Sequence, residues 1–321
     1  MTALAFLPPV PDKTRRMSEN VLTLIATEAA TDASGRAAMA ARHALSELGA
    51  TVSDEDWLAP RLVCDIGFDD VPPDQADAAC RAALKRELGT AAVDVVAQPR
   101  AGRKKALLVA DMEATIIANE MLDELAEIAG IEAQIAGITR RAMNGEIEFA
   151  GALRERVGLL KDLPESALVE AGARIRINPG AASLVATMRK HGAYTALVSG
   201  GFRRYADRVR GELGFDIAVA NELIVEGGRI AGTVKEPILG KEAKLATLTL
   251  LAVERRLSLA AALAVGDGAN DLPMIEAAGM GVAYHAKPVV AAAARLRIDH
   301  NDLTALLYAQ GYRADEIVGG A

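Results

Sequence analysis

The sequence predicts an α/β protein: a doubly wound parallel sheet with a helical cap, preceded by a small α+β domain. Three apolar runs lead to the first part of this prediction, residues 106–110, 195–198 and 261–265. Each is followed by a helical pattern, which is typical of strands buried on both faces of a parallel sheet. Before residue 99 the segments are shorter and alternate in type, which indicates a separate α+β unit.

Extended and helical patterns alternate in the first third of the chain, in the order strand, helix, strand, helix, strand: residues 21–26, 33–48, 62–68, 75–88 and 92–97. Gly49 and Gly89 follow the two helical patterns, and Pro72 and Pro73 precede the second. We therefore expect an N-terminal extension over residues 1–20 and an α+β domain over residues 21–98. This domain shows no catalytic constellation.

Residues 99–105 are short, polar and basic and include Pro99 and Gly102, so we expect a linker there. The larger domain then covers residues 106–321. Between its first two apolar runs, residues 117–177 are rich in helix-forming residues and long enough for a helical insertion. We expect this insertion to be the cap.

Composition excludes several classes of protein. Of the 321 residues 51% are hydrophobic, which predicts a globular chain. The net charge of −7 and the 3% of aromatic residues argue against a nucleic-acid partner. Two cysteines, Cys64 and Cys80, cannot form a disulfide framework, so we expect reduced thiols and a cytoplasmic protein. No apolar stretch reaches membrane-spanning length, and we expect no membrane association.

Polar residues follow the three apolar runs of the larger domain. Asp111 and Glu113 follow the first, and Asp267, Asn270 and Asp271 follow the third. The carboxyl ends of parallel strands meet at one edge of a sheet, so these side chains should converge. Carboxylates without a cluster of His or Cys suit a hard, oxygen-preferring cation such as Mg²⁺.

Ser199, Gly200 and Gly201 follow the second run and lead into a helix, an arrangement suited to binding a phosphate group. Lys244 could add a positive charge; Lys241 competes for that role. Together with an Asp and Mg²⁺, these groups suggest phosphoryl transfer through an aspartyl-phosphate. The sequence has neither a Gly-x-Ser-x-Gly elbow nor a P-loop, which argues against a serine hydrolase and a P-loop kinase.

Four segments resemble, in order, the motifs of the haloacid dehalogenase superfamily of phosphatases: Asp111-Met112-Glu113-Ala114-Thr115, Ser199-Gly200-Gly201, Lys244, and Gly266-Asp267-Gly268-Ala269-Asn270-Asp271. Within the predicted cap, Asn119-Glu120 and residues 153–164 resemble the phosphoserine phosphatase family of that superfamily, as does Tyr284-His285-Ala286-Lys287-Pro288 near the end of the chain. The N-terminal unit resembles, more faintly, the ACT-like regulatory domains of bacterial members.

The resemblance implies Mg²⁺-dependent hydrolysis of O-phospho-L-serine, a small-molecule substrate, in serine biosynthesis. Asp111 would attack phosphorus, and Glu113 would protonate the leaving seryl oxygen and then activate water. The Asp111 carboxylate, the Glu113 backbone carbonyl and Asp267 would hold Mg²⁺, with Asp271 orienting the site. Residues assigned to the phosphoryl oxygens are Ser199, Gly200 and Lys244, with Asn270 nearby.

The cap supplies the other contacts that the resemblance implies. Glu120 would pair with the ammonium group of the substrate and Arg156 with its carboxylate, and the two charges have the signs that a zwitterion requires. Met143 and Phe149 would form apolar walls, although a Met or Phe on a helix is as often part of a core.

One position departs from the family pattern, because Glu113 stands where Asp is usual. Its carboxyl lies one methylene further out, and we expect a folded-back side chain to shorten its reach. Two alternatives stay open: a phosphatase or phosphotransferase for another small phosphomonoester, and a serine- or phosphoserine-binding regulatory protein that has lost catalysis. The sequence also leaves open whether the N-terminal unit binds an amino acid, forms a homodimer or only supports the chain.

Overall fold

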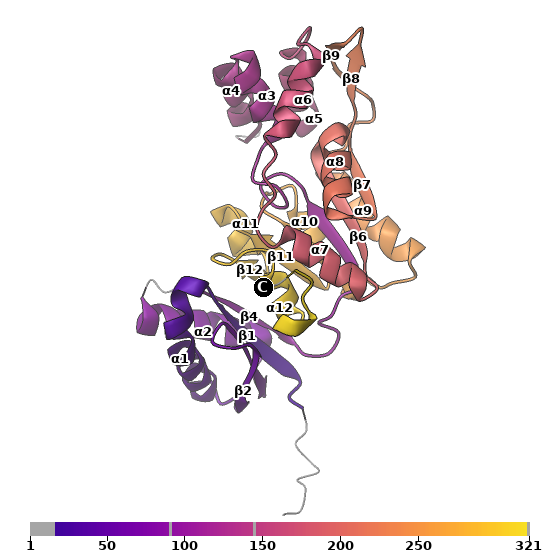
Figure 1. Ribbon diagram of the computed structural model, residues 1–321. Coiled ribbons are helices and arrows are strands. Elements are labelled where there is room, and N and C mark those ends of the chain that lie inside the picture. Colours follow the sequence, from indigo (N-terminus) through magenta and orange to yellow (C-terminus); the bar gives the residue numbers. More distant parts are fainter. Residues whose placement is uncertain (1–16, 90–91, 144–145, 320–321) are drawn as a thin grey trace, which may run out of the picture.

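A computed structural model describes residues 17–89, 92–143 and 146–319 of the chain. The extension expected over residues 1–20 lies almost entirely outside the described residues. Figure 1 shows three layers along the length of the molecule, with an N-terminal unit at one end, a central sheet flanked by helices, and a helical cap at the other end. Within the described residues, no helix is both long and apolar enough to cross a membrane.

The N-terminal unit is an antiparallel sheet with two helices on one face. Its elements are β1 (Asn20–Ala26), α1 (Ser34–Glu47), β2 (Thr51–Ala59), β3 (Val63–Asp69), α2 (Pro73–Leu88) and β4 (Val93–Pro99). The strand order is β2-β3-β1-β4. Side chains alternate across the strands, so that Leu22 and Leu24 pack beneath the helices whereas Ile25 belongs to the core of the rest of the chain.

Strand β2 was not predicted from the sequence. Its residues are mostly polar and only its last two are buried, because it is an edge strand. Its pairing with β3 is interrupted by two register shifts, between Val52 and Glu55 and between Trp57 and Ala59. Bulges of this kind disturb the alternation by which a strand is recognised in a sequence.

The central sheet is parallel, in the order β12-β11-β10-β5-β6-β7. The strands are β5 (Leu107–Asp111), β6 (Tyr194–Phe202), β7 (Ile217–Asn221), β10 (Ala262–Gly266), β11 (Met280–Tyr284) and β12 (Leu296–Ile298). β5 and β10 are buried along their whole length, as the continuous apolar runs predicted. β6 extends past the predicted run and includes Ser199, Gly200 and Gly201, with a register shift between Val198 and Phe202.

Helices cover both faces of the central sheet, which confirms the doubly wound prediction. They are α7 (Ala181–Lys190), α8 (Arg203–Leu213), α9 (Lys241–Glu254), α10 (Leu272–Ala277), α11 (Pro288–Ala293) and α12 (Ala305–Ala309). Leu108 packs in one core with Leu184 of α7, and Leu107 packs in another core with Leu248 of α9. Two apolar layers therefore hold β5 between them and fix the position of its last residue, Asp111.

The cap contains α3 (Met121–Ala129), α4 (Glu132–Met143), α5 (Phe149–Gly158) and α6 (Glu165–Ala173). The chain enters and leaves it through two paired segments, because Ala118 donates to the Arg176 carbonyl and Asn178 donates to the Ile116 carbonyl, both at 2.9 Å. A hairpin of β8 (Leu223–Glu226) and β9 (Arg229–Val234) lies beside these helices (Figure 1). The sequence prediction had no such hairpin.

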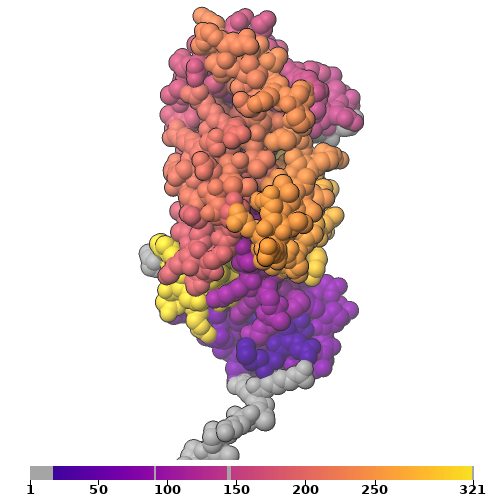
Figure 2. All heavy atoms as spheres, turned by 90° about the vertical axis from the view of Figure 1, so that its right-hand side faces the viewer, coloured from indigo at the N-terminus to yellow at the C-terminus, as the bar shows by residue number. Residues whose placement is uncertain are grey.

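The N-terminal unit is fastened to the central unit by buried polar contacts. Asp94 of β4 has no exposed surface, and its carboxylate accepts the backbone N–H groups of Asp299 at 2.7 Å and Asn301 at 2.9 Å. Gln98 donates from Nε2 to the Ala309 carbonyl at 2.6 Å. Figure 2 shows the C-terminal segment, in yellow, packed against the N-terminal unit.

Candidate active site

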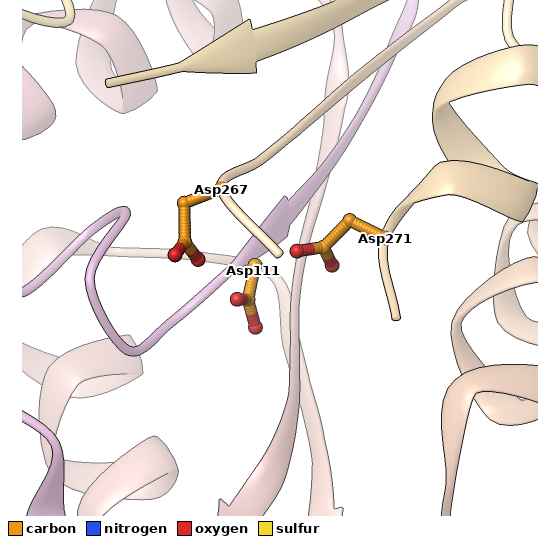
Figure 3. Close-up of side chains that lie close together, drawn as sticks. All are labelled: Asp111, Asp267 and Asp271. Atoms are coloured by element: carbon orange, nitrogen blue, oxygen red, sulfur yellow. The ribbon is translucent and has the colours of Figure 1, made fainter. Parts of the chain in front are cut away.

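Three aspartates converge at the carboxyl ends of β5 and β10. Asp111 is the last residue of β5, Asp267 follows β10, and Asp271 immediately precedes α10 (Figure 3). Their carboxylate oxygens lie within 4.8 Å of one another. The convergence predicted from the apolar runs is therefore present, because β5 and β10 are neighbours in the sheet.

Lys244 of α9 joins two of these carboxylates. Its Nζ lies 2.6 Å from Asp111 Oδ1 and 2.6 Å from Asp271 Oδ1, and its side chain is almost fully buried. Burial raises the pKa of Asp111 well above its usual range, and the charge of Lys244 opposes that rise. Burial alone would lower the pKa of Lys244, but Asp111 and Asp271 raise it above its ordinary value. Lys241 is exposed and pairs with Glu242, so Lys244 is the lysine that reaches the site.

The donor set fits a divalent metal ion. The cluster offers carboxylate oxygens, the ligands that hard cations prefer, and contains no sulfur or imidazole. Asp271 is the least available member, because Oδ1 accepts from Lys244 and Oδ2 accepts the N–H of Gly268 at 3.0 Å. Burial and the nearby Asp271 raise the pKa of Asp267. A cation between Asp111 and Asp267 would relieve that repulsion.

The carboxylate of Glu113 lies between the central sheet and the cap. Its Oε1 accepts the N–H of Met121, the first residue of α3, at 2.9 Å. A Cβ on Gly201 would lie only 2.6 Å from Glu113 Oε2, so the longer side chain fits here because Gly201 has none. Burial raises the pKa of Glu113, whereas the Met121 N–H and the charge of Lys244 lower it.

The end of β6 presents main-chain groups to the same place. The buried Ser199 Oγ accepts the N–H of Gly201 at 2.9 Å. Asn221 of β7, which was not predicted as a site residue, donates from Nδ2 to the carbonyls of Gly200 at 2.8 Å and Leu239 at 3.1 Å. These bonds hold the Ser199–Gly201 turn while Gly200 and Gly201 line the cleft.

The cap closes one side of a cleft of about 680 Å³. Of the predicted site residues, those lining this cleft are Asp111, Glu113, Glu120, Phe149, Arg156, Gly200, Lys244, Asp267 and Asn270. Ser199 lies buried behind it. The side chain of Met143 lies outside the described residues, so its predicted contact has no structural counterpart here.

Glu120 and Arg156 bring opposite charges into the cleft from the cap. Burial, followed by the carboxylates of Glu113 and Asp267, raises the pKa of Glu120 to about 7. Arg156 donates from Nε to the Ala152 carbonyl at 3.2 Å and makes no ion pair with any described residue. Burial lowers the pKa of Arg156, and Asp123, Glu113 and Glu120 oppose that effect.

Several lining residues were not predicted: Asp123, Thr139, Phe202, Lys287 and Val289. Lys287 stands within a segment that the sequence analysis noted for its resemblance but to which it assigned no role. Phe149 was predicted as an apolar wall, and its ring covers Gly200, where an added Cβ would lie 3.0 Å from Cζ.

The family model for haloacid dehalogenase-like hydrolases matches residues 108–276, more than half of the chain. The match includes β5 from Leu108 onward, the cap and all three aspartates of the cluster. With the parallel sheet, the metal-compatible carboxylates and the buried lysine, it defines the class: this chain belongs to the haloacid dehalogenase-like hydrolases.

Within that class, the relatives that the chain resembles are phosphoserine phosphatases. The one from Archaeoglobus fulgidus is 42% identical over 72% of this chain and 68% of its own length. That from Streptococcus thermophilus is 45% identical over 62% of this chain and 93% of its own. A solved structure, a probable phosphoserine phosphatase from Vibrio cholerae in unliganded form, is 29% identical with a TM-score of 0.73, covering 93% of this chain and 88% of that one.

Proposed function

We propose that this chain is a phosphatase that hydrolyses O-phospho-L-serine to L-serine and phosphate, with Mg²⁺ as its metal ion. The observation that carries the proposal is the single cleft in which the Asp111–Lys244 site faces Glu120 and Arg156 of the cap. Relatives named for this activity are 41–45% identical to the chain over 199–235 residues. The reaction is the hydrolytic release of serine from its phosphate ester.

Asp111 is the proposed nucleophile. One carboxylate oxygen attacks phosphorus, the bond from phosphorus to the seryl oxygen breaks, and the seryl oxygen takes a proton from Glu113. Water then attacks the phosphorus of the aspartyl-phosphate and gives a proton to Glu113. The bond from phosphorus to the Asp111 oxygen breaks, so phosphate is released and the Asp111 carboxylate is restored. The raised pKa of Glu113 suits this exchange, because burial favours the protonated form that the first step needs.

The proposed metal ligands are the carboxylates of Asp111 and Asp267 and the backbone carbonyl of Glu113. A bound divalent cation supplies positive charge that stabilises the transferring phosphoryl group. Lys244, the main-chain groups of Ser199 and Gly200, and the side chain of Asn270 are the proposed phosphoryl contacts. Lys244 also favours the ionised form of Asp111, because its Nζ lies 2.6 Å from Asp111 Oδ1.

The cap provides the proposed selectivity for an amino acid. Glu120 would pair with the ammonium group and Arg156, whose Nη groups form no ion pair with a described residue, with the carboxylate. Phe149 would form part of the apolar wall over Gly200, together with Met143. Substrate binding between cap and sheet would also exclude water from the phosphoryl group.

The N-terminal unit is proposed to be an ACT-like domain over residues 21–98, joined by residues 99–105 to the catalytic domain over residues 106–321, with a cap insertion near residues 117–177. Its element order, βαββαβ, and its strand order β2-β3-β1-β4 support this proposal. The family model matches residues 108–276, and the Streptococcus thermophilus relative matches 93% of its length with only 62% of this chain, which together favour catalysis by the C-terminal part.

The test is phosphate release from a panel of phosphomonoesters with and without Mg²⁺. The proposal predicts that O-phospho-L-serine has the highest kcat/KM of the panel, that release stops when the metal is chelated, and that Asp111→Asn is inactive. Preference for another ester would overturn the substrate assignment. Equal rates for Asp111→Asn and wild type would remove Asp111 from the mechanism.

A further inference from the structure

Lys287 brings a positive charge to the cleft from the turn between β11 and α11, a segment that supplies none of the substrate contacts proposed above. It follows β11 and precedes α11, so it comes from the strand next to β10 in the sheet. Its side chain is exposed and lines the cleft together with Asp267 and Glu120. Lys287 therefore shares the cleft with one carboxylate of the central sheet and one of the cap.

The turn that carries Lys287 is fixed by its main chain. The N–H of Lys287 donates to the Asp267 carbonyl at 3.3 Å. Two residues earlier, His285 donates its N–H to the Ile298 carbonyl at 2.9 Å, and its ring Nε2 lies 2.8 Å from the Asn301 carbonyl oxygen. Held on both sides, this turn keeps the lysine beside the Asp267 end of the cleft.

The position of Lys287 is not explained by the stability of α11. A cation at the N-terminus of a helix faces the positive end of the helix dipole, which is unfavourable. Among the described residues, Lys287 also makes no ion pair. Its charge is therefore uncompensated by a direct contact and is directed into the cleft.

The charges of the cleft show what such a cation can do. Among the described residues that line it, five are carboxylates and three are cations: Asp111, Glu113, Glu120, Asp123 and Asp267 against Arg156, Lys244 and Lys287. Lys244 is already bonded to two aspartates at 2.6 Å. An anionic phosphate ester entering this acidic cleft is attracted by positive charge near its phosphate end. The proposed divalent cation would supply part of that charge, and Lys287, whose N–H donates to the Asp267 carbonyl, adds to it from the same side.

We propose that Lys287 is a substrate-binding cation that stabilises the phosphate end of a phosphomonoester in this cleft. The inference rests on the proposed phosphatase function, but it concerns the phosphate group and does not depend on serine being the alcohol. It assigns Lys287 to binding and leaves the reacting atoms to Asp111 and Glu113.

The experiment compares Lys287→Met, which removes the charge but keeps an unbranched side chain one atom shorter, with wild type in the presence of Mg²⁺. We expect KM for O-phospho-L-serine and for p-nitrophenyl phosphate to rise by about tenfold each, with kcat changed by less than about twofold. The dissociation constant of inorganic phosphate, measured by calorimetry, should rise by a similar factor. Added salt should weaken binding to wild type more than to Lys287→Met.

Two variants serve as controls. Lys287→Arg keeps the charge and should keep KM within about threefold of wild type. Lys190→Met removes an equal charge from the exposed end of α7 and does not line the cleft, so it should leave KM unchanged. Matched melting temperatures would show that all three variants are folded.

Three results would overturn the proposal. In the first, KM and the phosphate dissociation constant stay within about twofold of wild type in Lys287→Met. In the second, KM rises for phosphoserine but not for p-nitrophenyl phosphate, which would show that Lys287 acts through Glu120 and the amino-acid part of the substrate. In the third, kcat falls while KM and phosphate affinity stay unchanged, which would indicate an effect through Asp267. A wild type that binds phosphate and cleaves p-nitrophenyl phosphate but not phosphoserine would refute only the proposed substrate.

Discussion

At Glu113 a single methylene separates this chain from the usual motif of its family, and the structure shows how that length is accommodated. The carboxylate turns toward the N-terminus of α3, where Met121 donates to it, and rests against Gly201. This position keeps it at the boundary of sheet and cap, beside Asp111 in the same cleft. The missing side chain of Gly201 therefore makes room for the longer side chain of Glu113.

Replacing Glu113 by Gln tests its proposed role as acid and base. Gln keeps the size of the side chain but cannot give or take the proton, so kcat should fall by about a hundredfold or more. Steady-state kinetics on phosphoserine measures this directly. Glu113→Asp, which keeps an ionisable carboxyl, should retain much more activity than Glu113→Gln. Equal activity of Gln and wild type would exclude Glu113 from proton transfer.

The pH dependence of substrate binding should report Glu120. Its pKa is raised to about 7, first by burial and then by Glu113 and Asp267, so the carboxyl is ionised above that pH and neutral below it. Only the ionised form can pair with an ammonium group. As pH falls through about 7, kcat/KM for phosphoserine should therefore fall more steeply than kcat/KM for a phosphomonoester without an amino group. Parallel profiles for the two substrates would argue against contact between Glu120 and the ammonium group.

At the scale of an element, the end of β6 must leave room for the carboxyl group of Glu113, which lies against Gly201. A Cβ on Gly201 would lie between 2.6 and 2.9 Å from the three carboxyl atoms of Glu113. Gly201→Ala should thus displace Glu113 and lower kcat by about tenfold or more while the protein stays folded. Phosphate release and a thermal melt measure the two effects.

Gly211 of α8 offers the matched control for that variant. A Cβ there would have nothing within 4 Å, so Gly211→Ala should leave kcat unchanged and stabilise the helix by about 0.5–1 kcal/mol. If Gly201→Ala instead kept wild-type kcat, the close approach of Glu113 to β6 would be irrelevant to turnover.

The elements that carry the chemistry could be predicted because their signals are local. A buried strand such as β5 is a continuous apolar run, and the polar residue that ends it, Asp111, must lie at the edge of the sheet. The role of Asn221 was not visible, because it depends on where β7 lies beside the turn at Gly200. The same holds for the hairpin of β8 and β9, because Ile230 of β9 forms backbone hydrogen bonds with Asp162 and Leu163, in the segment between α5 and α6.

At the scale of the whole molecule, the two ends of the central sheet have different tasks. The cap lies at one end and the N-terminal unit at the other (Figure 1). The cleft is lined by residues of the cap and of the adjoining ends of the strands. A hydrogen-bonded path connects them, from Asp94 to Asn301, from Asn301 to His285, and from the His285 turn to Lys287 and the Asp267 carbonyl. The N-terminal unit is thus attached to the loop that supports the metal side of the cleft.

Asp94 is the residue whose loss should expose this coupling. It is fully buried and accepts hydrogen bonds from the main chain of Asp299 and Asn301 and from the Asn301 side chain at 2.7–2.9 Å. Asp94→Ala would leave these donors unpaired in the interior, so the free energy of unfolding should fall by about 3 kcal/mol. Denaturant unfolding of the full chain measures this, and Asp74→Ala, on the exposed first turn of α2, should cost less than about 1 kcal/mol.

The same variant shows whether the hydrogen bonds of Asp94 only stabilise the folded protein or also position the active-site cleft. If the path through Asn301 and His285 supports the Lys287 turn, Asp94→Ala should raise KM for phosphoserine by a few fold under conditions where the protein is fully folded. Asp74→Ala should leave KM unchanged. If Asp94→Ala lowers the free energy of unfolding without changing KM, Asp94 contributes to stability and does not position the cleft. If the free energy of unfolding of Asp94→Ala falls by less than about 1 kcal/mol, this carboxylate does not hold the two units together.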